Sequence, residues 1–106
     1  GRHRKLHPTG GERIVHAPGD AEGLRAFPTE FGALSGLMCG ENSNPLSIFS
    51  LDAQGTTVHV ASWPAHFSLS TSMGDIIEVA SKALAYQTKS FVINAVGAID
   101  DRMREV

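Results

Sequence analysis

The sequence predicts a single α/β domain with parallel strands. From residue 32 onward, apolar runs and helix signals alternate in the order strand, helix, strand, helix, strand. This order is typical of parallel strands joined by right-handed crossovers. Glycines and prolines cluster between the segments, and no repeat or linker divides the 106 residues. We therefore expect one sheet, with ligands bound at the carboxyl ends of its strands.

A predicted hairpin precedes the first helix. Apolar segments at 25–27 and 32–39 flank residues 28–30, whose Pro-Thr-Glu composition favours a short turn. The second segment is predicted to be a buried strand that Cys39 closes. Cys39 is therefore expected at the sheet edge where ligands gather.

The next helix and strand have clear boundary signals. Asn44 can cap the helix because its side chain accepts from free backbone N–H groups, and Pro45 suits the first turn because it has no N–H. The helix should extend to about Gln54 and stop at Gly55, since glycine enters the left-handed conformation without a Cβ penalty. Residues 57–62 alternate branched and other side chains, which predicts a strand.

The last helix and strand follow a loop rich in serine and threonine. Asp75 is predicted to cap the helix, with Glu78 three positions later completing a capping box, and the helix should extend to about Lys89. Residues 91–96 are a largely apolar run, which predicts a strand buried on both faces.

Composition argues against several classes of function. The formal net charge of −2 predicts no general attraction to nucleic acid. Apolar stretches are far shorter than the roughly 20 residues that span a bilayer, and the start lacks a signal-peptide pattern, so no membrane partner is expected. One cysteine allows no internal disulfide, and we expect a cytoplasmic protein. Both ends look cut from a longer chain, because the first residue is not methionine and the last strand lies near the end.

Cys39 is the candidate nucleophile. A thiol has an unperturbed pKa of about 8.5, so a cysteine that attacks at neutral pH needs a nearby base or positive charge. Lys5 could hold a developing oxyanion or imide charge, and a carboxylate such as Glu12, seven residues later, can hold the ammonium in place. Composition alone would not bring these groups together. Trp63, at the end of the following strand, is expected either to form an aromatic wall beside Cys39 or to be an ordinary packed residue.

Four segments together resemble the nitrilase branch of the carbon-nitrogen hydrolases. They are RKLHPT followed by Glu-Arg, GLMCGEN followed by Asn-Pro-Leu, VHVASWP, and FVIN near the end. The resemblance covers nearly the whole chain in the family's own order. It implies that residues 1–106 are part of a single hydrolase domain, truncated at both ends, with a partial α-β-β-α sandwich fold.

The resemblance implies a catalytic set of a glutamate, a lysine and a cysteine. The lysine and the cysteine correspond to Lys5 and Cys39, whereas the first glutamate would fall before Gly1. Glu12 matches a second glutamate that orients the lysine. The backbone N–H of Gly40, just after the nucleophile, is expected to be a second donor to the developing charge.

Substrate contacts and two departures from the family pattern complete the comparison. Trp63 and Glu41 are the candidate substrate-binding residues, and the motif favours a positioning role for Glu41. Gly10-Gly11 replaces a bulkier pair before the glutamate and could loosen its hold on the lysine. Ser47-Ile48 replaces a small-then-basic pair and changes a helix surface.

The implied reaction converts a nitrile to a carboxylic acid and ammonia through a cysteine thioimidate and then a thioester, without a metal or organic cofactor. The partner is a small nitrile, and the full-length form is expected to be a homo-oligomer. Two alternatives stay open: an amidase or carbamoylase of the same superfamily, and a non-catalytic assembly or regulatory product. Because the first glutamate is missing, residues 1–106 alone are expected to be inactive.

The basic, histidine-rich start allows two competing interpretations. His3 and His7 could share a helix face as metal ligands, but Pro8 disfavours that helix. The basic run 2–5 lacks the interleaved aromatic residues of a nucleic-acid site. His59, inside a strand, is predicted to be packed and hydrogen-bonded.

Overall fold

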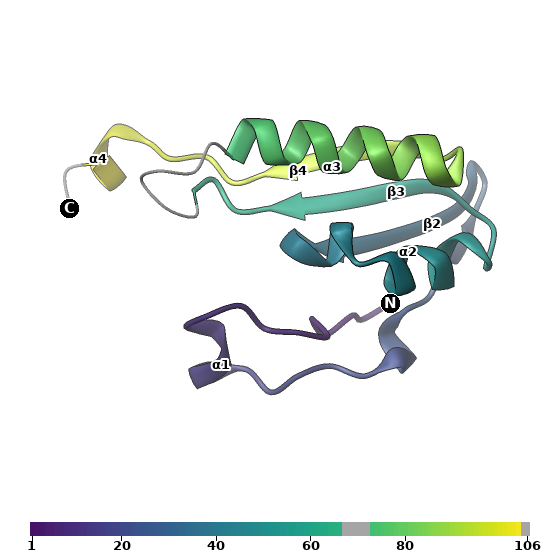
Figure 1. Cartoon of the computed structure of the whole chain (residues 1–106), viewed down its shortest axis with the longest axis horizontal. Helices are drawn as coiled ribbons and strands as arrows, with labels where there is room; N and C mark the ends of the chain where they lie inside the picture. Colours follow the sequence, from purple (N-terminus) through teal and green to yellow (C-terminus); the bar gives the residue numbers. More distant parts are fainter. Residues whose placement is uncertain (67–72, 105–106) are drawn as a thin grey trace.

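The computed structural model describes residues 1–66 and 73–104, which form one sheet with helices on one face and a long N-terminal segment alongside (Figure 1). The sheet has the order β1-β2-β3-β4. β1 is antiparallel to β2, and β2, β3 and β4 are parallel. The strands are β1 (Phe27–Thr29), β2 (Gly32–Met38), β3 (Thr56–Trp63) and β4 (Phe91–Val96).

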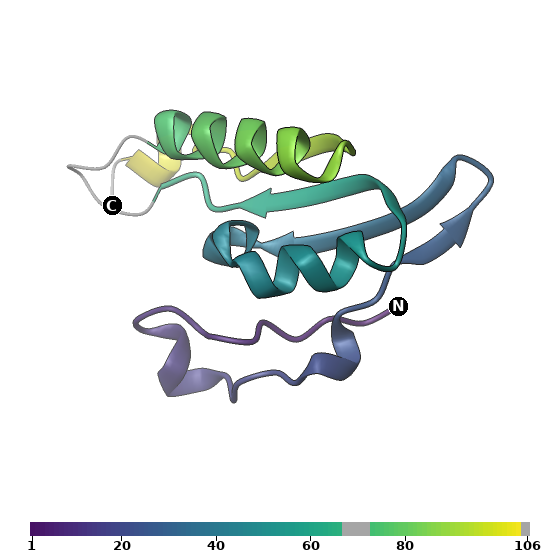
Figure 2. The same cartoon turned by 45° about the vertical axis from the view of Figure 1, so that its right-hand side comes forward.

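Two long helices cover one face of the sheet (Figure 2). They are α2 (Pro45–Asp52), between β2 and β3, and α3 (Met73–Thr88), between β3 and β4. The short helical turns are α1 (Glu12–Val15), η1 (Ala21–Gly23), η2 (Cys39–Ser43) and α4 (Asp101–Arg104). The predicted order of strands and helices from residue 32 onward is confirmed.

The buried core lies between the sheet and the two helices. Its apolar members come from β2, α2, β3 and α3: Leu37, Leu51, Ala61, Trp63 and Leu84. Along β3, burial alternates with the period of two that a half-covered strand requires, so His59 faces the helices and Val58 faces away. None of the described helices is long and apolar enough to cross a membrane.

Residues 1–26, which we call the strap, run beside β2 and then return (Figures 1 and 2). The two arms meet where the backbone N–H of Gly19 donates to the Lys5 carbonyl at 2.8 Å. Glycine is required there, because a Cβ on residue 19 would lie 2.1 Å from the Arg4 carbonyl oxygen. The returning arm is tied to the turn after α2 by Gln54, which accepts from the Ala26 N–H and donates to the Leu24 carbonyl.

Both signals predicted around α2 are confirmed. The Asn44 side chain accepts from the backbone N–H groups of Leu46 and Ser47. Gly55 has a φ of +81°, in the left-handed region that favours glycine. The helix ends at Asp52, two residues before the predicted end.

Two predicted boundaries were wrong. Pro28 and Thr29 lie in β1 and not in the turn. β1 is an edge strand, where a residue without an N–H is tolerated. Asp75 lies inside the first turn of α3, which already begins at Met73, so it is not the N-cap. The predicted serine- and threonine-rich loop falls largely outside the described residues.

The prediction that 91–96 is buried on both faces was also wrong. Phe91 is 73% exposed and Ile93 is 55% exposed. β4 is the last strand of the described sheet, and their side chains point to the face opposite α3. The apolar run correctly indicated a strand, but in the described residues the helices cover only one of its faces.

Candidate active site

Cys39 lies at a strained turn between β2 and η2. Its φ is +53°, a conformation that costs a non-glycine residue about 1–3 kcal/mol. The Asn42 side-chain amide stabilises the turn by donating to the Cys39 carbonyl at 2.9 Å. The thiol is partly exposed at the end of the strand. Strand-to-helix turns with such strained geometry can present a nucleophile.

Three buried side chains extend from this turn into the sheet. Asn42 uses its amide nitrogen on the Cys39 carbonyl, so its oxygen accepts from His59 Nε2 at 2.9 Å. His59 Nδ1 then accepts from the Ser35 hydroxyl at 2.8 Å. Burial lowers the pKa of His59 to about 4, which keeps the ring neutral as this arrangement requires. The prediction of a packed, hydrogen-bonded His59 is confirmed.

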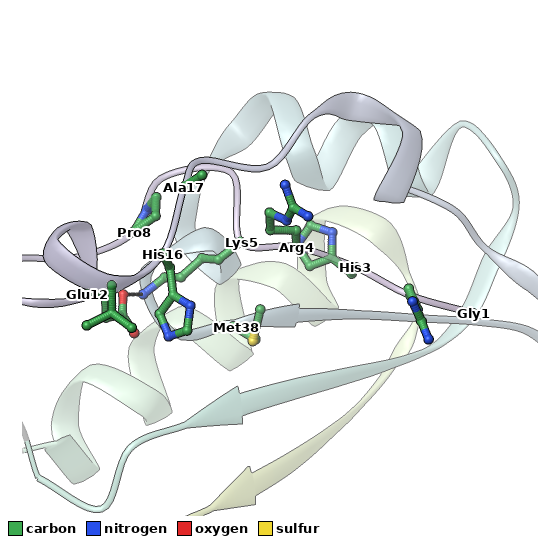
Figure 3. Close-up of a pocket in the computed structure, with 11 residues that line it drawn as sticks. Gly1, His3, Arg4, Lys5, Pro8, Glu12, His16, Ala17 and Met38 are labelled. Atoms are coloured by element: carbon green, nitrogen blue, oxygen red, sulfur yellow. Dashed lines mark hydrogen bonds and ion pairs between the residues drawn. The ribbon is translucent and has the colours of Figure 1, made fainter.

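The strap brings Lys5 and Glu12 together (Figure 3). Lys5 Nζ donates to Glu12 Oε2 at 2.6 Å and to Thr9 Oγ1 at 2.8 Å. Glu12 Oε2 also accepts from the Thr9 backbone N–H at 2.6 Å. The Lys5 hydrogen bond, followed by the Thr9 N–H, lowers the pKa of Glu12. Glu12 is therefore an ionised carboxylate that holds a largely buried ammonium.

Lys5 and Cys39 line the same pocket, although 34 positions separate them in the sequence. The pocket has a volume of about 560 Å³. The strap contributes Thr9 and Glu12 to its wall, and the end of β3 contributes Trp63. A larger open hollow of about 870 Å³ lies beside it and shares Lys5, Glu12 and Met38; Figure 3 shows this second space.

Trp63 and Gly40 both lie close to Cys39, Trp63 on the wall of the same pocket and Gly40 next in the sequence. Trp63 lines the pocket but is only 4% exposed, and its indole N–H donates to Asn94 at 2.9 Å. It therefore combines a pocket-facing edge with a packed ring. Gly40 is the second residue of η2, and an N–H in the first turn of a helix has no acceptor within that helix.

Glu41 lies in the interior and not on the wall of the pocket. It is 4% exposed and is not among the residues that line the pocket. Its carboxylate accepts from the backbone N–H groups of Leu6 and Met38 and from His3 Nε2. All three donors belong to the protein, so both oxygens of the Glu41 carboxylate are engaged inside the chain.

Comparison with known protein families assigns the chain to one of them. A family model described as carbon-nitrogen hydrolase matches residues 1–103. The chain belongs to the carbon-nitrogen hydrolase family. The resemblance to this family that was inferred from four sequence segments is therefore confirmed, and it extends over almost every residue.

This carbon-nitrogen hydrolase chain is similar to several proteins named as nitrilases. It is 44% identical over 97 residues to Nitrilase 2 of an unknown prokaryotic organism, covering 92% of this chain and 29% of that relative. It is 35% identical to a nitrilase of Pseudomonas syringae pv. syringae, covering 100% of this chain and 33% of the relative. A bromoxynil-specific nitrilase of Klebsiella pneumoniae subsp. ozaenae is 35% identical, with coverage of 87% and 26%. The chain thus spans about a third or less of the length of these relatives.

Sequence reasoning did not identify two supporting residues of this candidate site. Thr9 was visible only as part of a motif, yet it contacts both Lys5 and Glu12. Asn42 supports the Cys39 carbonyl. Its signal was the cysteine motif, but spacing alone does not tell which backbone group an amide will reach. Among the described residues, no three His, Cys, Asp or Glu side chains gather in a way that could hold a metal ion.

Proposed function

We propose that this chain supplies the nucleophile and the charge-stabilising lysine of a nitrilase. The observation that carries the proposal is that Lys5 and Cys39, from separate segments, open onto one pocket. The strained turn presents the thiol, and Glu12 and Thr9 aim the ammonium. A nucleophile with a fixed cation nearby suits a substrate that develops negative charge when it is attacked.

The proposed reaction begins when the Cys39 thiolate attacks the nitrile carbon and forms a C–S bond. Negative charge develops on the nitrile nitrogen, which accepts a hydrogen bond from the Lys5 ammonium and one from the Gly40 N–H, then gains a proton to give a thioimidate. Water adds to this carbon, the C–N bond breaks and ammonia leaves. A second water cleaves the resulting thioester, releasing a carboxylic acid and restoring the thiol.

Glu12 is not assigned as the base of this reaction. Its pKa is lowered by the Lys5 hydrogen bond and the Thr9 N–H, so it is a weak proton acceptor at neutral pH. Its oxygen Oε2 already accepts from both groups. We propose that Glu12 orients Lys5 and that another carboxylate of the complete protein takes the proton.

The substrate class is proposed from the names of the relatives. They include an aliphatic nitrilase, an arylacetone-specific nitrilase and a bromoxynil-specific nitrilase, so a small nitrile is the shared feature. The proposed chemistry uses no organic cofactor, because the thiol and two waters account for every bond changed. We further propose a cytoplasmic location, where a free thiol stays reduced, and assembly of the complete protein into a homo-oligomer.

Product analysis tests the proposal. The complete gene product is incubated with an aliphatic, an aromatic and an arylacetonitrile substrate, and ammonia and carboxylic acid are measured. We expect both in equal amounts from at least one nitrile, and none from Cys39→Ala. Turnover of amides alone would indicate an amidase or carbamoylase, and turnover of neither class would indicate a non-catalytic product. Residues 1–106 alone remain predicted to be inactive.

A further inference from the structure

One buried carboxylate contacts the backbone of both segments that carry the site. Glu41 Oε1 accepts from the Leu6 N–H at 2.7 Å, and Glu41 Oε2 accepts from the Met38 N–H at 3.2 Å. Leu6 directly follows Lys5, and Met38 directly precedes Cys39. One carboxylate oxygen therefore binds the segment that carries Lys5, and the other binds the segment that carries Cys39.

His3 provides a third donor to the same carboxylate. Its Nε2 lies 3.0 Å from Glu41 Oε2, and its buried Nδ1 has no hydrogen-bond partner. The surroundings of the ring therefore favour the proton on Nε2, where Glu41 uses it. With three donors, a carboxylate that is only 4% exposed has its charge compensated inside the protein.

The strap depends on this carboxylate because it shares no strand ladder with β2. In the part of the chain that the structure describes, every hydrogen bond that joins residues 1–19 to β2 or η2 ends on Glu41. Lys5, Thr9 and Glu12 hold one another, but these contacts stay within the strap. They orient the ammonium without fixing its distance from Cys39.

We propose that Glu41 is a positioning residue that sets the place of Lys5 relative to Cys39. The inference rests on the proposed function for its catalytic consequence, whereas its structural part stands on the contacts alone. Glu41 acts through the backbone of Leu6 and Met38 and does not touch the substrate. Misplacing a catalytic group by about 1 Å can cost about 100-fold in rate, so such an anchor has a measurable effect.

Two substitutions of Glu41 and one matched control test this role in the complete gene product. Glu41→Gln keeps the shape but replaces one oxygen with an NH₂ group, so either the Leu6 N–H or the Met38 N–H loses its acceptor in any rotamer. Glu41→Asp keeps the charge but is one methylene too short to reach both segments, and it replaces Glu41→Gln if that variant does not fold. Glu78→Gln makes the same chemical change on the exposed surface of α3.

The first measurement is amide hydrogen exchange of Leu6 and Met38, which does not require turnover. We expect exchange of at least one of these two amides to be about tenfold or more faster in Glu41→Gln, and exchange of both to be unchanged in Glu78→Gln. Exchange at wild-type rates in both Glu41 variants would overturn the proposal. If the wild-type protein hydrolyses no nitrile, the proposed function fails, while this measurement still decides the role of Glu41.

The second measurement is kcat divided by the amount of Cys39 that a thiol reagent titrates. We expect kcat per titrated Cys39 to fall about 10- to 100-fold in the Glu41 variants, with KM within about threefold of wild type. A purely structural role would lower the melting temperature and the titratable fraction and leave kcat per titrated site unchanged. That result would overturn the proposal.

Discussion

The sheet and the strap hold their functional residues by different physical means. Cys39 is placed by the ladder of β2 with β3 and by the network of Asn42, His59 and Ser35 beneath it. Lys5 has no ladder and depends on side-chain contacts within the strap and on Glu41. The comparison teaches that Cys39, the proposed nucleophile, is built into the fold, whereas Lys5 lies outside it, so we expect Lys5 to be displaced more easily than the sheet is unfolded.

Removing the positive charge of Lys5 should have the largest effect on the reaction. We expect Lys5→Met to lower kcat about 1,000-fold or more, because the developing negative charge loses its nearest cation. The melting temperature should fall only by what the Lys5–Glu12 pair contributes, since the ladders do not involve Lys5. Steady-state kinetics and thermal unfolding check both expectations, with Lys82→Met on the exposed side of α3 as the control. Similar losses in both variants would contradict the assignment.

Loosening the hold on Lys5 should have a smaller effect. We expect Glu12→Gln to lower kcat about 10- to 100-fold, because the ammonium keeps its charge but loses its charged partner. The exposed Glu22→Gln, in the same strap, should behave like wild type. Wild-type kinetics in Glu12→Gln would show that the pair at 2.6 Å is not needed for catalysis.

The ion pair of Lys5 and Glu12 predicts that the free energy of unfolding depends on pH. The pKa of Glu12 is lowered from 4.5 in the folded state, so the unfolded chain binds its proton first as the pH falls. Stabilisation by the pair is therefore fully present well above pH 4.5 and is lost as the pH falls through the lowered pKa. Urea unfolding at pH 7 and below pH 4.5 should show this loss in wild type and not in Glu12→Gln.

The buried network of Asn42, His59 and Ser35 predicts a second loss of stability, which begins at a higher pH than the loss at Glu12. The pKa of His59 is about 4 when folded against 6.5 for an unperturbed ring, so only the unfolded chain is protonated between these values. Stability should fall as the pH drops from 6.5 toward 4, and His59→Gln should weaken this dependence. The variant should also cost about 1–3 kcal/mol at pH 7, because buried partners lose hydrogen bonds. His7→Gln, at an exposed position, is the control for urea unfolding.

The smallest expected effect comes from the turn that feeds β3. Gly55→Ala should cost about 1 kcal/mol, because a Cβ is disfavoured at a φ of +81°. Gly11→Ala in the strap should be close to neutral in urea unfolding, since no atom lies within 4 Å of its would-be Cβ and its φ is −62°. Equal costs at both positions would show that the left-handed conformation is not the cause.

The sheet was more predictable from sequence than the strap because its signals are local. Asn44 and Gly55 mark the ends of α2 through their own backbone preferences, and the apolar run of β2 ends beside Cys39. The placement of Lys5 depends on long-range contacts such as that between Leu6 and Glu41, 35 positions apart. No propensity encodes such a contact, and the resemblance to nitrilases alone paired Lys5 with Cys39.

Burial was the other quantity that sequence could not determine. The apolar residues of β4 indicated a strand but not which faces would be covered, since Phe91 and Ile93 are exposed. For Glu41, proximity to the cysteine suggested a substrate contact, whereas the structure directs its carboxylate to backbone N–H groups. Both outcomes depend on which element lies opposite the side chain.

Mass analysis of a trapped intermediate tests the central claim most directly. The complete gene product is mixed with a nitrile that it hydrolyses. The reaction is quenched in acid within the first turnovers, and the protein is digested for peptide mass measurement. The account predicts a thioimidate or thioester adduct on the peptide that contains Cys39, and none in Cys39→Ala. Nitrile hydrolysis that persists in Cys39→Ala, or an adduct on a different residue, would contradict it.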